Sequence, residues 1–316
     1  MENAGFFKVR ISTLVPEKPI TFDLHLKLNN QVIVYLRGGD RLEKKKITAL
    51  ESRDSGDFFL VKDEDRKAYK SYVHEQMISD DLNVREKALL LKESSMTLVE
   101  ELFEHPDVNK ALDGARPVIK QFVEFMKAEP EAMGHLISLS GHDFYTYNHS
   151  LDVGIYSLGL AEKMGFDEKE LEEMGIAALL HDVGKRQISL DILCKKGGLS
   201  DAEWSQMKKH PQYGLVILNQ NPNVSDAVKA ACFEHHESWT GNGYPQQISG
   251  EEIHPFARIV AITDTYDAMT TQRSYNVPMT PHEAVTMMRD KLAGRYDPDM
   301  LKALHSVLFQ LKAVAS

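Results

Sequence analysis

Short apolar runs that partly alternate with polar residues dominate the first part of the chain. Four runs rich in β-branched and aromatic side chains cover residues 6–11, 20–26, 31–36 and 58–61. Turn-forming residues separate them, and Asn29-Asn30 between the second and third runs is typical of a hairpin turn. The pattern predicts a small, mainly β domain over residues 1–64.

Beyond residue 64 the apolar positions recur at helical spacing. Over residues 65–106, leucines recur at roughly helical spacing among charged residues, which predicts a linker of one or two amphipathic helices. Simple packing explains this spacing, and a homodimer contact is the alternative. From residue 107 to residue 316 the pattern is almost wholly helical. The expected fold class is therefore α+β overall, with an all-α domain behind a small β domain.

Three helix starts in the second domain carry capping signals, in which Asp, Ser or Thr precedes a Glu by three positions. The pairs are Asp167 with Glu170, Ser200 with Glu203, and Thr280 with Glu283. We expect the first pair to open the helix that ends at His181-Asp182. The second should open the helix carrying His210, and the third a C-terminal helix.

Composition narrows the class of protein without identifying it. The 316 residues include 37 basic and 47 acidic side chains, a formal net charge of −10, which disfavours polymeric nucleic acid as a partner. The chain has no apolar run of the ~18–20 residues that span a bilayer and no secretory leader. Its two cysteines form no disulfide framework. We therefore expect no membrane span and a cytoplasmic location.

An adjacent histidine and aspartate, His181-Asp182, follow the apolar run of residues 174–180. Such a pair is costly at the end of a hydrophobic helix unless a partner satisfies it, and both side chains are ligands for divalent metals. The two aspartate oxygens can bridge two ions. Lys185 brings a positive charge to the same place, and Gly184 would let the backbone approach a ligand. A capped or solvated chance pair is the alternative.

Five polar clusters interrupt the apolar helices of this domain. They contain His149, His181-Asp182, His210, His235-His236 and Asp264. Adjacent histidines on a helix point about 100° apart, so His235-His236 suits two ions, or one ion approached from the side. Each cluster alone has a structural explanation, as a core histidine, a helix-end histidine or a capping acid. Together, five histidines and two aspartates are enough to hold two ions and leave positions for water and substrate.

Other candidate ligands lie in the same domain, and we exclude them from the site. Cys232 lies three residues before His235, but its small and apolar neighbours indicate a core residue. Several histidines lack a comparable polar context. They are His135, His142, His254, His282 and His305.

Three long motifs of this domain resemble the HD-GYP family. They are residues 181–185 (HDVGK), residues 235–245 (HHESWTGNGYP) and residues 257–275, which contain TDTYDAM and RSY. This family is a branch of the HD metal-dependent phosphohydrolases, and its known activity is hydrolysis of the bacterial second messenger cyclic di-GMP. The resemblance covers roughly residues 110–316. It implies an HD-type helical bundle there and leaves the N-terminal domain unassigned.

The resemblance also implies a role for each matching residue. The seven side chains named above would hold two divalent ions, with Asp182 bridging them and acting with Lys185 in catalysis. Lys185 would contact the scissile phosphate, Gly243 and Tyr244 the substrate, and Arg273 a phosphate. Imidazole and carboxylate ligands without thiolate favour iron, with manganese as the alternative, and no organic cofactor is implied.

Four departures from the family pattern modify these expectations. Tyr145 stands where some members place a Glu and gain a third metal, so we expect two ions. Thr240 replaces the usual Asp of the loop, which we expect to loosen it. Asn276 replaces a basic residue that grips the second phosphate, which would weaken affinity for the dinucleotide. The N-terminal domain does not resemble a phosphoacceptor receiver, so phosphorylation control is not indicated.

The sequence therefore predicts a metal-dependent phosphodiesterase that hydrolyses cyclic di-GMP to the linear dinucleotide or GMP. The alternative, motivated by Asn276 and Thr240, is a weak or inactive binding or scaffold protein in cyclic dinucleotide signalling. Hydrolysis of another nucleotide or cyclic dinucleotide is the third possibility. Diguanylate cyclases or other signalling proteins would be the protein partners.

Overall fold

The chain folds into two compact units. The computed structural model describes residues 5–28, 31–45, 58–104, 108–140, 146–195, 197–272 and 277–310. Its contacts divide the chain into Met1–Leu98 and Val99–Ser316. The finer division expected from the sequence, with a separate linker over residues 65–106, stays a prediction. The α+β fold class is confirmed, because an antiparallel sheet precedes a unit in which all the described elements are helical.

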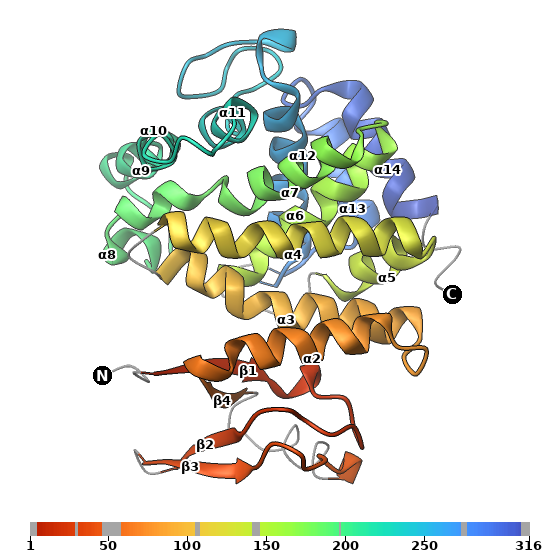
Figure 1. Ribbon diagram of the computed structural model, residues 1–316. Coiled ribbons are helices and arrows are strands. Elements are labelled where there is room, and N and C mark those ends of the chain that lie inside the picture. The colour runs from red at the N-terminus through yellow and green to blue at the C-terminus, as the bar shows by residue number, and fades with distance from the viewer. Residues whose placement is uncertain are drawn as a thin grey trace. The chain divides into compact units, whose positions relative to one another are not determined.

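The first unit is a small sheet packed with helix α2. Its strands follow the order β1-β4-β2-β3, and each described pair is antiparallel. Phe7 of β1 packs on Tyr69 of α2 with ring centroids 5.7 Å apart, and both belong to one buried cluster. The elements are β1 (Phe6–Arg10), η1 (Ile11–Thr13), β2 (Leu24–Leu28), β3 (Gln31–Leu36), β4 (Phe58–Lys62), η2 (Asp63–Asp65), α2 (Arg66–Ile78) and α3 (Val84–Glu104), of which α3 continues into the second unit (Figure 1).

The second strand is shorter than predicted. Ile20 and Phe22 are buried in the core but lie before β2. The Ile20 backbone instead pairs with the turn after β3, donating to the Asp40 carbonyl at 3.0 Å and accepting from Gly39 at 2.8 Å. The hairpin turn predicted at Asn29-Asn30 lies outside the described residues.

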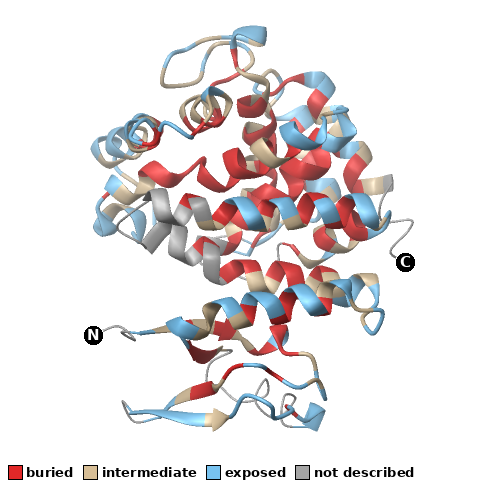
Figure 2. Ribbon diagram, in the orientation of Figure 1, coloured by how far each residue is buried: buried red, intermediate tan, exposed pale blue. Residues whose placement is uncertain are grey.

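The second unit is built around helices α6 and α7, each of which contains a long run of buried residues. Residues 151–161 of α6 and 174–180 of α7 are all buried, and α11 and α12 pack against them (Figure 2). The elements are α4 (Val108–Ala128), α5 (Ala132–Leu139), α6 (Thr146–Lys163), α7 (Glu168–Leu180), η3 (Val183–Gln187), α8 (Leu190–Leu193), α9 (Asp201–Met207), α10 (His210–Leu218), α11 (Asp226–Glu234), η4 (Gly250–Glu252), α12 (Pro255–Thr270), α13 (Pro281–Asp290) and α14 (Pro298–Gln310).

The capping signals place the helix starts correctly. Capping boxes form at Asp167 before α7, at Ser200 before α9 and at Thr280 before α13. None of the helices in the described ranges combines the length and the apolar character that crossing a bilayer requires.

Candidate metal centre

The predicted ligands come together because several helices begin or end at one place. Helix α7 ends at Leu180, so His181 and Asp182 follow directly, and α11 ends just before His235. His210 is the first residue of α10, whereas His149 and Asp264 lie within α6 and α12. Although the seven side chains are spread over 116 positions of sequence, from residue 149 to residue 264, they converge on one region of the second unit.

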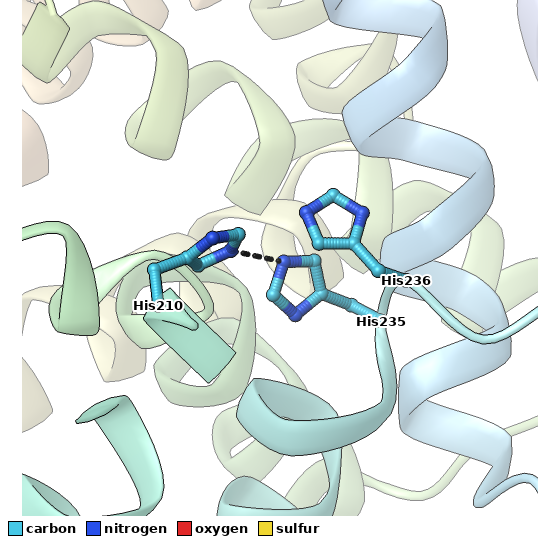
Figure 3. A group of neighbouring side chains, drawn as sticks. All are labelled: His210, His235 and His236. Atoms are coloured by element: carbon cyan, nitrogen blue, oxygen red, sulfur yellow. Dashed lines mark hydrogen bonds between the residues drawn. The ribbon is translucent and has the colours of Figure 1, made fainter. Parts of the chain in front are cut away.

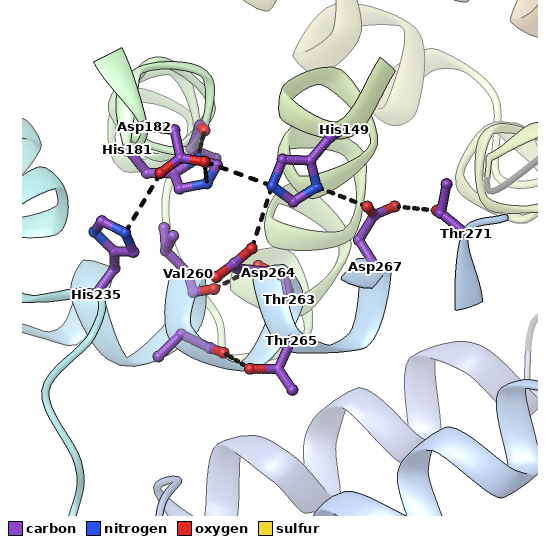
Figure 4. Close-up of polar contacts among 12 residues, drawn as sticks. His149, His181, Asp182, His235, Val260, Thr263, Asp264, Thr265, Asp267 and Thr271 are labelled. Carbon is purple, nitrogen blue, oxygen red and sulfur yellow. Dashed lines mark hydrogen bonds and ion pairs between the residues drawn. The ribbon is translucent and has the colours of Figure 1, made fainter. Parts of the chain in front are cut away.

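One group of ligands surrounds His149. His149, His181 and Asp182 offer ligand atoms that lie within 4.8 Å of one another. Asp264 joins this group, with its Oδ1 at 3.2 Å from His149 Nε2 (Figure 4). Two imidazoles and two carboxylates therefore face a common point.

A second group consists of His210, His235 and His236, again within 4.8 Å (Figure 3). His210 Nε2 and His235 Nε2 lie 3.3 Å apart, and the His235 and His236 ring centroids 4.1 Å apart. Both adjacent histidines join one group, because they follow the end of α11 and are not held 100° apart by a helix.

Asp182 lies between the two groups. Its Oδ2 is 3.3 Å from His181 Nε2 and 3.8 Å from His149 Nε2. Its Oδ1 is 3.2 Å from His210 Nε2 and 3.8 Å from His235 Nε2. One carboxylate oxygen thus faces each group, which is the arrangement that a bridging ligand needs.

In four of these histidines, the Nδ1 atom lies within hydrogen-bonding distance of an acceptor oxygen. Each Nδ1 faces an oxygen that can only accept, so Nδ1 carries the hydrogen and Nε2 is left with its lone pair for a cation. The partners are the carbonyl of Ala178 for His181 (2.6 Å), that of Met207 for His210 (2.9 Å), that of Cys232 for His235 (2.9 Å), and the Asp267 carboxylate for His149 (2.7 Å).

The prediction that the Ser200 capping box opens the helix carrying His210 was wrong. Helix α9 ends at Met207, and His210 begins the next helix. The reason is Pro211, which has no N–H to donate to the Met207 carbonyl and whose ring disrupts a continuous helix. The carbonyl that is freed accepts the His210 Nδ1 hydrogen bond, so the helix break also orients the imidazole.

Asp267 is the residue of this centre to which the sequence analysis gave no role. It is fully buried, accepts from His149 Nδ1 and also receives a hydrogen bond from Thr271 Oγ1 at 2.9 Å. The sequence contained an indication of this role, because Asp267 lies three positions after Asp264 and so points to the same side of α12.

Replacing Asp267 with Asn should lower the affinity for divalent metal by about 10- to 100-fold, because an amide holds the His149 ring less strongly than a carboxylate does. Metal titration of the purified protein measures this. Asp290→Asn, at an exposed aspartate of α13, should leave the affinity unchanged. Equal affinities of Asp267→Asn and the wild type would show that Asp267 does not support the centre.

The charges of the centre suit cation binding. Although burial favours the neutral acid, the Lys185 ammonium and neighbouring histidines hold the pKa of Asp182 well below its usual range. Burial lowers the pKa of His235 well below its ordinary value and that of His236 to about 3, so both rings are neutral. Burial opposes charge on His149 too, yet contacts with Asp264 and Asp267 raise its pKa to about 10. Without a metal ion, His149 Nε2 therefore carries a proton that faces Asp264, and a cation bound between these two side chains would replace that proton.

Two buried polar atoms support the same conclusion. Among the described residues, neither His181 Nε2 nor Asp182 Oδ1 makes a hydrogen bond. Leaving such atoms unsatisfied in a protein interior is costly, and a coordinated cation would satisfy both. The nitrogen and oxygen donors of the two groups fit divalent metal ions.

Lys185 and Gly184 lie next to this centre in η3. The Lys185 ammonium pairs with Asp182 Oδ2 and is 35% exposed, so it can also be reached from solvent. Gly184 lies against the backbone of α10, which gives the glycine a packing role, and the approach of a ligand to this backbone stays a prediction. A Cβ at Gly184 would lie 1.9 Å from the His210 carbonyl oxygen.

The loop after His236 brings Tyr244 onto the metal centre. The Tyr244 ring stacks on the His236 ring with centroids 4.8 Å apart. Trp239 and Thr240 both donate backbone hydrogen bonds to the segment Gly294-Arg295, at 2.9 and 3.1 Å. The loosening expected from Thr240 in place of Asp stays a prediction. The remaining predicted positions lie outside the described residues. They are Tyr145, Arg273 and Asn276.

The residues excluded from the site have other contacts. Cys232 is fully buried, burial raises the pKa of its thiol, and it packs against Gly214, as predicted for a core residue. His254 caps α12 by accepting from the Phe256 amide. The His282 and His305 rings both lie against Phe309, and His142 is outside the described residues.

Comparisons with known proteins agree with this geometry. The profile of the HD domain family matches residues 131–300. The chain is 33% identical to cyclic di-GMP phosphodiesterase PA4108 of Pseudomonas aeruginosa over 222 residues, which cover 70% of this chain and 53% of that protein. It is 36% identical to 3'3'-cGAMP-specific phosphodiesterase 2 of Vibrio cholerae over 49% of this chain and 30% of that protein. The chain thus spans about half the length, or less, of these two relatives.

A solved structure shares the fold over nearly the whole chain. Bd1817, an HDG"Y"P protein from Bdellovibrio bacteriovorus, matches with a TM-score of 0.75 and 22% identity, covering 96% of this chain and 99% of that one. The family profile covers more than half of the chain, and the HD and GYP motifs both lie at the centre described above. The chain therefore belongs to the HD domain family, in its HD-GYP branch.

Proposed function

We propose that this chain is a metal-dependent phosphodiesterase that hydrolyses cyclic di-GMP to the linear dinucleotide or GMP. The observation that carries the proposal is the position of Asp182, one oxygen of which faces each ligand group. Two neighbouring cations, when bound, would supply Lewis acidity and lower the pKa of water near the phosphodiester. Iron is the metal we favour, with manganese as the alternative.

The chain's own residues would hold and orient the substrate. Lys185 is close enough to Asp182 to pair with it and exposed enough to meet a phosphate oxygen from solvent. Its ammonium would stabilise the charge that grows on the phosphate during in-line attack. Tyr244, half-buried over His236, offers an aromatic face and a hydroxyl to a base or ribose.

The identity of the substrate is supported by the relatives' names. PA4108 is named a cyclic di-GMP phosphodiesterase, and the same name is given to a Thermotoga maritima relative that is 36% identical over 51% of this chain and 44% of that protein. We expect the activity in the cytoplasm, and the signalling partners we propose are diguanylate cyclases or other signalling proteins.

The proposal is tested by incubating the metal-loaded protein with cyclic di-GMP and separating the products. We expect linear dinucleotide or GMP to accumulate with iron or manganese and not after chelation. No turnover with either metal would overturn the proposal and favour the binding or scaffold role.

The second candidate substrate is 3'3'-cGAMP, because the Vibrio cholerae relatives named for it are as similar to this chain over the shared region. Parallel measurements of kcat/KM with both cyclic dinucleotides separate the two. A higher value for 3'3'-cGAMP would assign the chain to that substrate.

A further inference from the structure

Glu237 is a buried acid beside the centre to which the proposed reaction gives no role. It directly follows the histidine pair and is 3% exposed. Its Oε1 accepts hydrogen bonds from the backbone amides of Gln246 at 2.5 Å and Gln247 at 3.1 Å. One side-chain oxygen therefore ties the start of the loop to a point nine and ten residues later.

The loop between Glu237 and Gln246 folds back so that Gly243 lies against the backbone of Glu237 and Ser238. A Cβ at Gly243 would lie 2.4 Å from both Glu237 Cα and the Ser238 amide nitrogen, so only glycine fits there. The next residue, Tyr244, donates its amide hydrogen to the His236 carbonyl at 3.2 Å. This contact sets the Tyr244 ring over the His236 imidazole.

The backbone at the closing end of the loop is strained. Gln247 has φ of +61°, a left-handed conformation that a residue with a side chain rarely adopts. The hydrogen bond that the Gln247 amide donates to Glu237 Oε1 stabilises this otherwise unfavourable conformation. Without the acceptor, the loop would lose the bonds that hold Gln246 and Gln247 in place and, with them, the constraint on Tyr244.

We propose that Glu237 is a positioning residue that holds the Tyr244 loop closed on His236 and thereby sets the affinity for the cyclic dinucleotide. This role of Glu237 depends on the proposed function only in its effect on substrate affinity. Glu237 acts through the loop, and its contacts require a hydrogen-bond acceptor at Oε1. Its second oxygen, Oε2, makes no hydrogen bond among the described residues, so an amide can replace the carboxyl without removing a described bond.

The test compares Glu237→Ala with Glu237→Gln, and the control is Glu252→Ala. Glu252 also accepts a hydrogen bond from a backbone amide, that of Ser249, but its side chain is exposed and it lies after the loop that Glu237 closes. We expect Glu237→Ala to raise KM at least about tenfold while kcat changes less than about threefold and the metal content stays at the wild-type value. Glu237→Gln should restore KM to within about threefold, and Glu252→Ala should match the wild type.

A double-mutant cycle shows whether Glu237 acts through Tyr244. Adding Glu237→Ala to Tyr244→Ala should change KM by less than about twofold, because the ring that the loop positions is already absent. Additive effects would overturn the inference. So would a loss of metal in Glu237→Ala, or a Gln variant as impaired as the Ala variant.

Hydrogen exchange provides a readout that does not depend on turnover. Amides of residues 238–248 should exchange at least about tenfold faster in Glu237→Ala than in the wild type, and at the wild-type rate in Glu237→Gln. If the wild type hydrolyses no cyclic dinucleotide, the proposed function fails while exchange still decides the role of Glu237. Unchanged exchange in Glu237→Ala would overturn that role in either case.

Discussion

Asp182→Asn is expected to remove both the second metal ion and the phosphodiesterase activity. The substitution keeps the size of the side chain but removes the charge that faces both ligand groups. Four histidine Nε2 atoms then lie within 4 Å of a neutral amide, which is a poor bridge between two cations. We expect kcat/KM for cyclic di-GMP to fall by at least about 1,000-fold.

Metal analysis and steady-state kinetics on the same preparations measure this effect. Asp191→Asn makes the same chemical change at an exposed position of α8 and should behave as the wild type. Circular dichroism checks whether Asp182→Asn is folded. A folded variant that keeps two ions per chain and at least a tenth of the activity would contradict the bridging role.

Gly184→Ala is expected to have the largest effect on stability. The added Cβ would lie 1.9 Å from the His210 carbonyl oxygen and 2.4 Å from the Gly214 amide nitrogen. Both contacts are with backbone, which cannot rotate away as a side chain can, so η3 and α10 must separate. We expect the free energy of unfolding of the second unit to fall by about 3 kcal/mol or more, at or beyond the usual cost of overpacking.

The separation would also move His210 away from Asp182, so the second ligand group should bind metal more weakly. Thermal unfolding and metal titration measure the two effects. Gly198→Ala is the matched control, because a Cβ there meets no atom within 4 Å, and its unfolding should shift by less than about 0.5 kcal/mol. If Gly184→Ala were as stable as Gly198→Ala, the close packing of η3 on α10 would be wrong.

The candidate ligands that converge at the centre could be singled out in the sequence because each is a polar residue in an apolar helical context. Burying a polar side chain without a partner costs free energy. The sequence shows this problem at His181-Asp182, which follows a buried run, and at Asp264, which lies within α12. The capping boxes were equally visible, because they depend on residues three positions apart.

The contacts between distant segments could not be predicted in the same way. The Asp267–His149 hydrogen bond joins residues 118 positions apart, and the role of Gly184 depends on how closely α10 packs. Local pattern also failed at Pro211, where the apolar spacing continues but the helix does not. In each case tertiary packing decides the outcome, and a single sequence does not report it.

In the proposed centre, Asp182 would bridge two divalent ions, one held by each ligand group. Anomalous diffraction from crystals of the manganese-loaded protein tests this arrangement, because it locates each ion without assuming its ligands. We predict two peaks about 3.5–4 Å apart, one on each side of the Asp182 carboxylate. A single peak, or two peaks that do not share Asp182 as a ligand, would contradict the bridging role of Asp182.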